Sequence, residues 1–365
     1  MLLGVFSIIY IITLILQIIV PFIVRETIVF GVTVPEQNIK HSTLAKMKKR
    51  YTQIVGSAGF FLFIIMVISY KMLAPSESMQ SLVLLGCLFG MLIVSMLLYW
   101  VNYQKVSALK KQEQWGLHIK QVRAVDLTAR SRDEMLPWSF FAVPLAIPIF
   151  LMIYTVLYYD QMPANIAVHW GPNGEADAWK AKTYFTAMSL PILMLLMQCM
   201  MWGIADSIKR SAIKLAVNRK EESLEDQLKT RKYISWNLLL VSYALTILLT
   251  VLQLSNIYPS IIEGYKLLPL FILFLVVVLG SLVVYAMKKH KHKVHYKESI
   301  DSQVMDVDED RYWKGGLIYM NRHDPSVFVE KRFGIGWTMN LANPRGYIVI
   351  GLPFILLLLI SIFSL

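Results

Sequence analysis

The chain has 365 residues, of which 56% are hydrophobic and 16% are charged, and its mean hydropathy is +0.53. Because soluble domains carry about 25% charged residues, this composition excludes an ordinary soluble protein and indicates a polytopic membrane protein. The formal net charge of +12 would suit an anionic partner, but its distribution along the chain favours an account based on membrane topology. Each span takes about 20 residues, so little of the chain remains for a catalytic domain.

Eight apolar runs are each long enough to cross a bilayer as a helix. They cover residues 2–24, 54–72, 79–101, 140–159, 184–205, 235–254, 267–287 and 347–363. The first run has no basic segment before it and is followed directly by Arg25, so we interpret it as a retained helix and not as a signal peptide. The sequence therefore predicts an all-α polytopic membrane protein with about eight transmembrane helices and small β elements in its loops.

Lys and Arg are distributed unevenly over the connections between these runs. Four alternate connections, residues 25–53, 103–138, 206–234 and 288–346, hold 32 of the 36 basic residues. Basic residues beside a span resist translocation, so we expect these connections to be cytoplasmic and both termini to be extracellular. The basic segments would contact anionic membrane lipids, and no nucleic-acid partner is expected.

The spans themselves contain few polar residues. Gln17, Gln198, Asn237 and Gln253 occur within them, but no Asp, Glu, Lys or Arg lies at the middle of a run. Ion-coupled pumps and voltage sensors generally need charge inside the membrane. The sequence therefore argues against a proton relay.

The connection 160–182 is expected to be an extracellular loop rich in turn formers. Residues 165–170 alternate between apolar and polar and include β-branched side chains, which predicts a short strand. Pro172, Asn173 and Gly174 predict a turn after this strand. We interpret the polar stretch 175–182 as the return to the membrane at the start of the fifth helix.

Three side chains of this loop, His169, Glu175 and Asp177, carry groups that can bind zinc. The loop has no HExxH or CxxC motif and no second histidine, so the sequence predicts neither a metal nor another cofactor. Two other interpretations stay open. One is a loop packed on the outer face of the helices, and the other is a peptide-binding surface with exposed aromatic side chains.

The loop resembles a known bacterial membrane domain over about 25 residues. The resemblance is carried by Pro163, the core Ile166-Ala167-Val168-His169-Trp170, Gly174, Asp177, Trp179 and Lys182. This pattern is similar to that of SdpI-type immunity proteins, which protect a cell from its own secreted antimicrobial peptide and in one system also relay the presence of the toxin to a cytoplasmic repressor. The resemblance implies a Gram-positive bacterial cell membrane as location and a secreted peptide toxin as ligand. It implies ligand binding by Pro163, His169, Trp170, Gly174, Asp177 and Trp179.

The last cytoplasmic connection contains a second pattern. Its residues are Tyr319, Asn321, Asp324, Pro325, Phe328, Val329, Lys331, Arg332, Gly334, Gly336, Trp337, Thr338 and Asn340. They resemble a small module often carried at the C-terminus of such multi-span proteins, for which no biochemical role is implied. We expect strands at 319–321 and 327–329 around a turn at 322–325, and a second turn at 334–336.

Two uses of this module are open. Lys331 and Arg332 ahead of a Gly-x-Gly turn are suited to a phosphate or lipid headgroup, but no P-loop follows, which argues against ATP hydrolysis. We favour a docking hairpin for the inner helix ends or for a cytoplasmic regulator. Its docking residues would be Lys331, Arg332, Gly334, Gly336, Trp337 and Asn340.

These observations divide the chain into five parts. They are an N-terminal three-helix region (1–138), an SdpI-like membrane domain (139–206), a loop with two further spans (207–287), the cytoplasmic module (288–346) and a final span (347–365). The resemblance favours a non-enzymatic protein that gives immunity to, or senses, envelope-directed antimicrobial peptides and relays this to a cytoplasmic regulator. The alternatives are a transporter or flippase accessory and a metal-dependent membrane hydrolase.

Overall fold

The computed structural model describes residues 2–72, 77–117, 119–124, 126, 128–171, 174–259, 267–291, 304–334 and 336–363. In this part of the chain, seven helices are long and apolar enough to cross a membrane. They are α1 (Leu2–Ile23), α2 (Ser42–Met72), α3 (Glu77–Gln112), α4 (Ala142–Leu157), α5 (Tyr184–Arg210), α6 (Lys220–Ile257) and α7 (Leu268–Lys291). The predicted fold class, a mainly helical multi-pass membrane protein, is confirmed.

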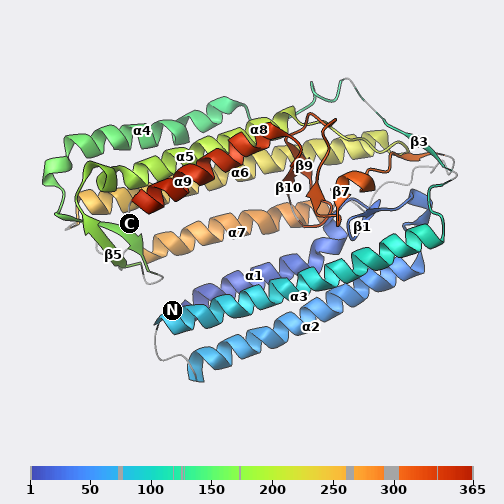
Figure 1. Ribbon diagram of the computed structural model, residues 1–365, viewed down its shortest axis with the longest axis horizontal. Helices are drawn as coiled ribbons and strands as arrows, with labels where there is room; N and C mark the ends of the chain where they lie inside the picture. The colour runs from blue at the N-terminus through green and yellow to red at the C-terminus, as the bar shows by residue number, and fades with distance from the viewer. Residues whose placement is uncertain are drawn as a thin grey trace.

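The eighth apolar run has a different form. The short helical turn α8 (Pro344–Gly346) leads through a π-helical turn at Tyr347–Gly351 into α9 (Leu352–Phe363). The three segments follow one another from Pro344 to Phe363, but the regular helix α9 has only 12 residues, fewer than the roughly 20 that a perpendicular α-helical span needs. It lies along α5 (Figure 1), so this run forms a shorter apolar helix beside seven long ones.

The helices form two bundles joined by α7 (Figure 1). One bundle contains α1, α2 and α3, and the other contains α4, α5, α6 and α9. The Asn237 amide of α6 donates to the Ser281 hydroxyl of α7 (2.5 Å), while Ala286 of α7 packs against Val20 and Ile23 of α1. Because α7 contacts both bundles, it holds them side by side.

The buried amides of the second bundle join its helices to one another. Gln198 of α5 donates to the Thr246 hydroxyl of α6 (3.0 Å) and accepts from the Ser242 hydroxyl. Gln253 of α6 donates to the Thr155 hydroxyl of α4 (2.8 Å). Interhelical hydrogen bonds of this kind hold membrane helices together where the hydrophobic effect cannot, so these polar residues have a packing role.

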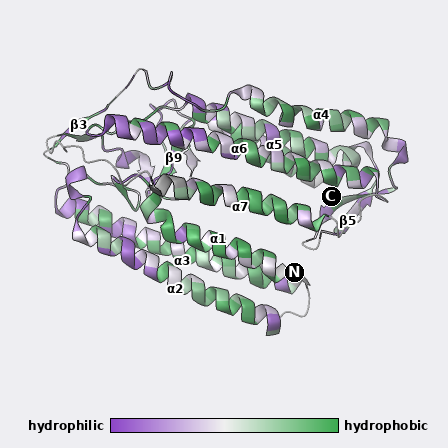
Figure 2. Ribbon diagram, turned by 180° about the vertical axis from the view of Figure 1, so that it is seen from behind, coloured by the Kyte–Doolittle hydropathy of each residue, from purple (hydrophilic) through white to green (hydrophobic). Residues whose placement is uncertain are grey.

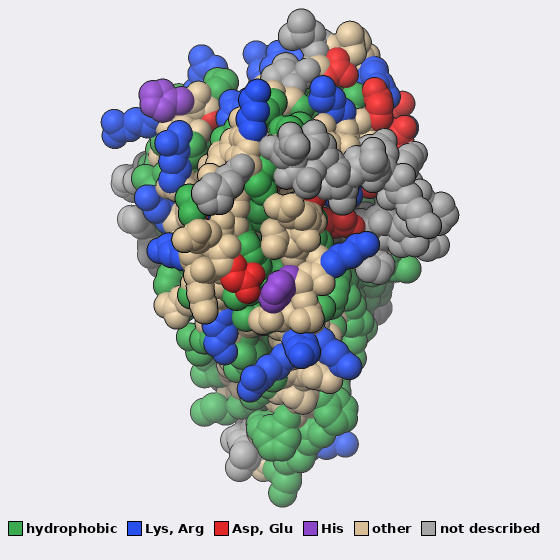
Figure 3. Space-filling model, turned by 90° about the vertical axis from the view of Figure 1, so that its right-hand side faces the viewer, with side chains coloured by type: hydrophobic (Ala, Val, Ile, Leu, Met, Phe, Trp, Pro, Cys, Tyr) green, Lys and Arg blue, Asp and Glu red, His purple; other side chains and the backbone are tan. Residues whose placement is uncertain are grey.

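The two ends of the molecule differ in composition (Figures 1 and 2). We call the end that carries strands β4 (Asn165–Trp170) and β5 (Ala176–Ala181) the hairpin end; both chain termini lie towards it. We call the opposite end the basic end, and Figure 3 shows Lys and Arg side chains spread over it. It holds the remaining strands: β1 (Ile28–Val29), β2 (Val32–Thr33), β3 (Lys120–Val122), β6 (Val304–Asp306), β7 (Trp313–Lys314), β8 (Ile318–Tyr319), β9 (Phe328–Glu330) and β10 (Trp337–Met339).

One local prediction was wrong. The stretch 175–182 is not the start of the fifth helix, because residues 176–181 form β5 and α5 begins only at Tyr184, where Thr183 and Thr186 form a capping box. The strands expected on either side of the turn 322–325 are present as β8 and β9, but they do not pair with each other. Instead β8 pairs with β7, and β9 pairs with β10. In both cases the choice of partner strand decides the structure, and the local pattern does not contain that information.

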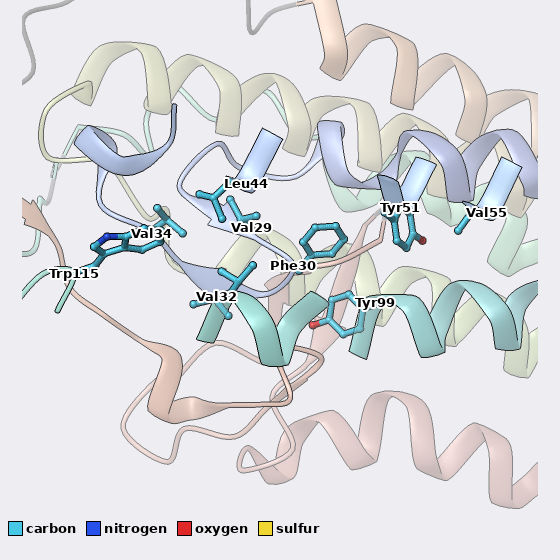
Figure 4. Packing of buried hydrophobic residues seen from close by; sticks show 10 residues of the cluster. Val29, Phe30, Val32, Val34, Leu44, Tyr51, Val55, Tyr99 and Trp115 are labelled. Carbon is cyan, nitrogen blue, oxygen red and sulfur yellow. The ribbon is translucent and has the colours of Figure 1, made fainter. Parts of the chain in front are cut away.

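The core of the basic end is built around a tight turn between β1 and β2. Phe30 and Gly31 both have positive φ (45° and 80°), as a two-residue hairpin turn requires. Phe30 then packs against Tyr51 of α2 and Tyr99 of α3 (Figure 4). The ring of Phe333, from the C-terminal module, lies 4.0 Å from that of Tyr99 between ring centroids. The module is therefore part of this core.

Candidate functional site

The hairpin β4–β5 is the one predicted ligand-binding element at its end of the molecule. Its strands are antiparallel, with Ile166 opposite Lys180 and Ala167 opposite Trp179, and the register shifts on both sides of His169. Gly174 has a φ of +85° and donates to the Gly171 carbonyl (2.9 Å), so this position favours glycine. Pro172 and Asn173, which complete the predicted turn, lie outside the described residues.

The inner face of the hairpin is seated on the helices. Ile166 and Met162 are buried together with Ala187 of α5 and Ile257 of α6. Trp170 is half-buried against the leucine cluster between α4, α5, α6 and α7. Two of the six predicted ligand-binding residues are therefore not fully available to a ligand. Trp170 is held against the helices, and Pro163, just before β4, is half-buried.

Two polar side chains fix the hairpin more specifically. The buried Asn256 of α6 accepts from the Ala167 N–H (3.1 Å) and donates to the Ala167 carbonyl (3.0 Å). Lys182 donates to the Met162 carbonyl (2.9 Å) and to the Tyr159 carbonyl (3.3 Å). Backbone groups satisfied in this way resist local opening, so these contacts hold β4 and the segment before it on the helices.

The outer face of the hairpin brings three predicted residues into solvent. The His169 Nδ1 lies 2.5 Å from Asp177 Oδ1, and the two side chains are 68% and 52% exposed. Trp179 is 56% exposed. A carboxylate at Nδ1 favours the tautomer with its proton on that nitrogen, which leaves Nε2 as an acceptor or a ligand. The arrangement can hold a polar group at Nε2 beside an exposed indole ring.

The hairpin offers few further groups to a metal ion. In the described ranges, no group of three or more His, Cys, Asp or Glu side chains is placed to hold one. A single imidazole and a carboxylate that already pairs with it make a poor donor set for zinc, which takes three or four protein ligands.

At the basic end, the predicted docking residue Arg332 is buried and already bonded. It donates to the Gly31 carbonyl (3.0 Å), pairs with Asp310 and lies over the Trp313 ring, 5.0 Å from its centroid. Asp310 also accepts from the Thr33 N–H (3.0 Å) and hydroxyl (2.7 Å) and from Lys110 (2.7 Å). One carboxylate therefore joins the module to β2 and to α3.

The charges around Asp310 decide its ionisation. Burial acts to raise the pKa of the Asp310 carboxyl, but the cations of Arg332 and Lys110 and the hydrogen bonds from Lys110 and Thr33 outweigh burial, so its pKa lies below the ordinary value. The carboxylate form is thus the one that the fold stabilises.

Asn340, another predicted docking residue, is fully buried inside the module. Its side chain accepts from the Asn321 N–H (3.0 Å) and donates to the carbonyls of Asn321 (2.9 Å) and Asp324 (3.1 Å). It thereby fixes the turn at 322–325, and it presents no group to an outside partner. Gly334 and Gly336 have φ values of +94° and +92° in the link from β9 to β10, which favours glycine at both positions.

The two remaining docking residues border a cavity. Lys331 is exposed, Trp337 is half-buried, and both line a space of about 770 Å³ at the basic end. Its charged lining includes Arg25, Arg123, Arg130, Lys214, Arg311 and Arg332 together with Asp126, Asp306, Glu309, Asp324 and Glu330. Several of these charges pair across the wall, as Arg25 does with Glu330 (2.9 Å) and Lys214 with Glu309 (2.6 Å).

Sequence reasoning missed the two residues that fix these elements, Asn256 and Asp310. Asn256 is the second residue after the apolar run 235–254, and it lies about one helical turn after Gln253. Polar residues are common at the ends of spans, so the presence of Asn256 there does not indicate burial. Only its spacing to Gln253, which places both side chains on the same face of the helix, pointed to a buried role. Asp310 belongs to an acidic stretch that gives no signal of burial.

Comparison with known families finds two matches. Residues 146–195, which contain the hairpin, match a family described as a domain of unknown function (DUF1648), and residues 322–347 match a family of unknown function (DUF5808). Both are families associated with membrane proteins. No curated protein and no solved structure matches the chain. The chain thus combines two membrane-associated modules, one at each end of the molecule.

Proposed function

We propose that this protein is a non-enzymatic bacterial membrane protein that binds envelope-directed antimicrobial peptides through the hairpin β4–β5 and thereby gives immunity to them or senses them. The observation that carries the proposal is a hairpin fixed by Asn256 that holds His169, Asp177 and Trp179 in solvent. Exposed aromatic side chains on a rigid turn lose little entropy on binding and are typical of binding surfaces.

The location of charge supports an extracellular hairpin. Basic residues concentrate at the basic end, and cytoplasmic connections are enriched in Lys and Arg. With that end in the cytoplasm, the hairpin and both termini face outward. A secreted peptide would then have access to the hairpin.

The C-terminal module supports a relay to a cytoplasmic regulator. The Ser211 hydroxyl, at the end of α5, donates to the Phe328 carbonyl (2.8 Å), and the Ala212 N–H donates to the Ser326 hydroxyl (3.1 Å). Since α5 begins directly after the hairpin, a displacement of this helix on ligand binding would reach the module. Its exposed Lys331 and the cavity beside it are the surfaces for a regulator.

A survival assay tests the function. A sensitive Gram-positive host expresses the intact protein, a His169→Ala/Asp177→Ala variant or an Asp206→Ala/Arg210→Ala control at matched membrane levels, and it is exposed to a panel of envelope-active peptides. The control removes an exposed ion pair of 2.7 Å at the other end of the molecule. We expect protection by the intact protein and the control and its loss in the hairpin variant. Survival of all three strains at the level of the sensitive host without the protein would contradict direct immunity.

A metal-dependent hydrolase at the same hairpin is the second candidate, although it would need metal ligands beyond those that the described part of the hairpin offers. It is favoured by the imidazole of His169 that Asp177 orients, because a carboxylate at Nδ1 also supports metal-bound or basic histidines. Loss of protection on addition of a chelator, with cleaved peptide in the medium of untreated cells, would favour hydrolysis over binding.

A further inference from the structure

The two edges of the hairpin are not equivalent. The Lys182 N–H donates to the Ala164 carbonyl (2.8 Å), so this pair is hydrogen-bonded across the ladder. Because such pairs alternate in an antiparallel ladder, the pair Ala167–Trp179 points its backbone groups away from the partner strand. The outward groups of Ala167 lie on the β4 edge, and those of Trp179 lie on the β5 edge.

The β4 edge is closed by a side chain. Asn256 binds both outward groups of Ala167, its N–H and its carbonyl. The side-chain amide of Asn256 supplies one donor and one acceptor to Ala167, as the backbone of a third strand would. This edge therefore cannot accept another strand without displacing α6.

Within the described part of the chain, the β5 edge is open. Among the described residues, none outside the ladder hydrogen-bonds to the Trp179 N–H or carbonyl or to the Ala181 N–H, whereas the Ala181 carbonyl accepts from the Thr186 hydroxyl (2.9 Å). The helices pack against β4, and β5 forms the outer strand (Figure 1). Exposed unpaired strand edges of this kind pair readily with an extended chain.

The side chains beside this edge define the chemistry of its partner. Exposed carboxylates lie at Asp160, Glu175 and Asp177. The two lysines of this stretch, Lys180 and Lys182, are only half-exposed, and Lys182 is held by two carbonyls and by the Tyr159 ring. The exposed rings of Trp179 and Tyr184 can also accept cations on their faces. The edge thus matches a basic segment.

We propose that the free edge of β5 binds a basic, extended peptide segment as a third strand. The Trp179 N–H and carbonyl and the Ala181 N–H pair with its backbone, and Asp177 and the aromatic rings contact its cationic side chains. This inference rests on the function proposed above, because it gives the binding mode and the ligand class for the same hairpin.

A binding experiment with two matched probes tests the strand addition. The full chain is reconstituted in nanodiscs of zwitterionic lipid, which lack the anionic headgroups that attract basic peptides. One probe is a blocked nine-residue peptide that alternates lysine and valine. The second has the same sequence with every backbone amide N-methylated, so it keeps the charge but has no donors. Hydrogen exchange locates the binding.

We expect the unmethylated probe to bind at least about tenfold more tightly than the methylated one, because backbone hydrogen bonds supply affinity in strand addition. It should slow exchange at the Trp179 and Ala181 amides. Asp177→Asn should weaken binding about threefold, as exposed charge pairs do. Equal binding of both probes, binding without protection of these amides, or no binding overturns the proposal.

The results separate this inference from the proposed function. If the hairpin protects cells but methylation has no effect, strand addition is wrong while peptide immunity holds. If binding depends on methylation but no cell is protected, the strand site holds and immunity is wrong.

Discussion

Single residues of the hairpin divide into those that hold it and those that it displays. Lys182 and Asn256 use their polar groups on backbone atoms, whereas His169, Asp177 and Trp179 leave much of their surface in solvent. The sequence pattern of the hairpin thus contains residues that fix its structure as well as residues that could bind a ligand. Loss of function on substitution therefore needs a structural readout before it is assigned to binding.

Hydrogen exchange in an Asn256→Leu variant provides such a structural readout. Replacing Asn256 with leucine keeps a similar volume but leaves the buried N–H and carbonyl of Ala167 without partners, which costs about 1–3 kcal/mol. We expect faster hydrogen exchange over residues 165–170, with little change in the helices. Asn237→Leu, which breaks a hydrogen bond to Ser281 between α6 and α7, is the matched control. Equal exchange of the hairpin in both variants would show that Asn256 does not fix it.

The two strands of the hairpin differ in how well the sequence predicts them. The strand 165–170 could be predicted because it alternates and contains β-branched side chains. Residues 176–181 have the sequence ADAWKA, whose alanines favour a helix, yet they form β5 because β4 provides a partner. Pairing between strands is a tertiary effect, and the local sequence does not reveal it.

At the scale of elements, the C-terminal module acts as a clamp. It binds β2 and α3 through Asp310, the link between α1 and β1 through the Arg25–Glu330 pair, and the C-terminal end of α5 through Ser211. The module thus contacts both helix bundles at the basic end and adds to the contacts that α7 and Arg219 make between them. Its location within the connection 288–346 could be predicted, but these contacts could not, because they link residues between 117 and 305 positions apart.

Asp310→Asn tests the clamp. The amide keeps the size of the side chain but no longer neutralises Arg332 and Lys110, and the loss of one partner from a partly buried charge cluster costs about 2–4 kcal/mol. We expect a lower midpoint of thermal unfolding and faster exchange in β9 and β10. Asp206→Asn, at an exposed pair with Arg210, should change stability by less than about 0.5 kcal/mol. Equal effects of both variants would contradict the clamp.

The same carboxylate gives a pH dependence with a defined sign. Because the pKa of Asp310 is lowered in the fold, its contribution to the free energy of unfolding is complete above the unfolded pKa of about 3.9 and is lost as pH falls through the lower folded value. The stability difference between the protein and Asp310→Asn should therefore shrink below about pH 4. Thermal unfolding from pH 7 to pH 3 measures it. A difference that stays constant over this range would assign the stabilisation to shape and not to charge.

At the scale of the whole molecule, α6 connects the two candidate sites. Its 38 residues extend over about 57 Å, from the buried pair of Arg231 with Asp133 (2.7 Å) at the basic end to Asn256 under the hairpin. A membrane protein with few charges in its spans can still connect its two faces if one rigid helix carries contacts at both ends. The apolar runs predicted the span of α6, but not its extension to Lys220.

The orientation of the molecule decides whether the hairpin can meet a secreted peptide. We expect Gln161→Cys, at the hairpin end, to react with a membrane-impermeant maleimide in intact cells, and Lys314→Cys, at the basic end, to react only after permeabilisation, because basic connections stay in the cytoplasm. Both positions are exposed, and Cys87 and Cys199 are replaced by alanine to remove the native thiols. Labelling of Lys314→Cys but not of Gln161→Cys in intact cells would reverse the orientation. The hairpin would then face the cytoplasm, and its ligand would have to be an intracellular segment.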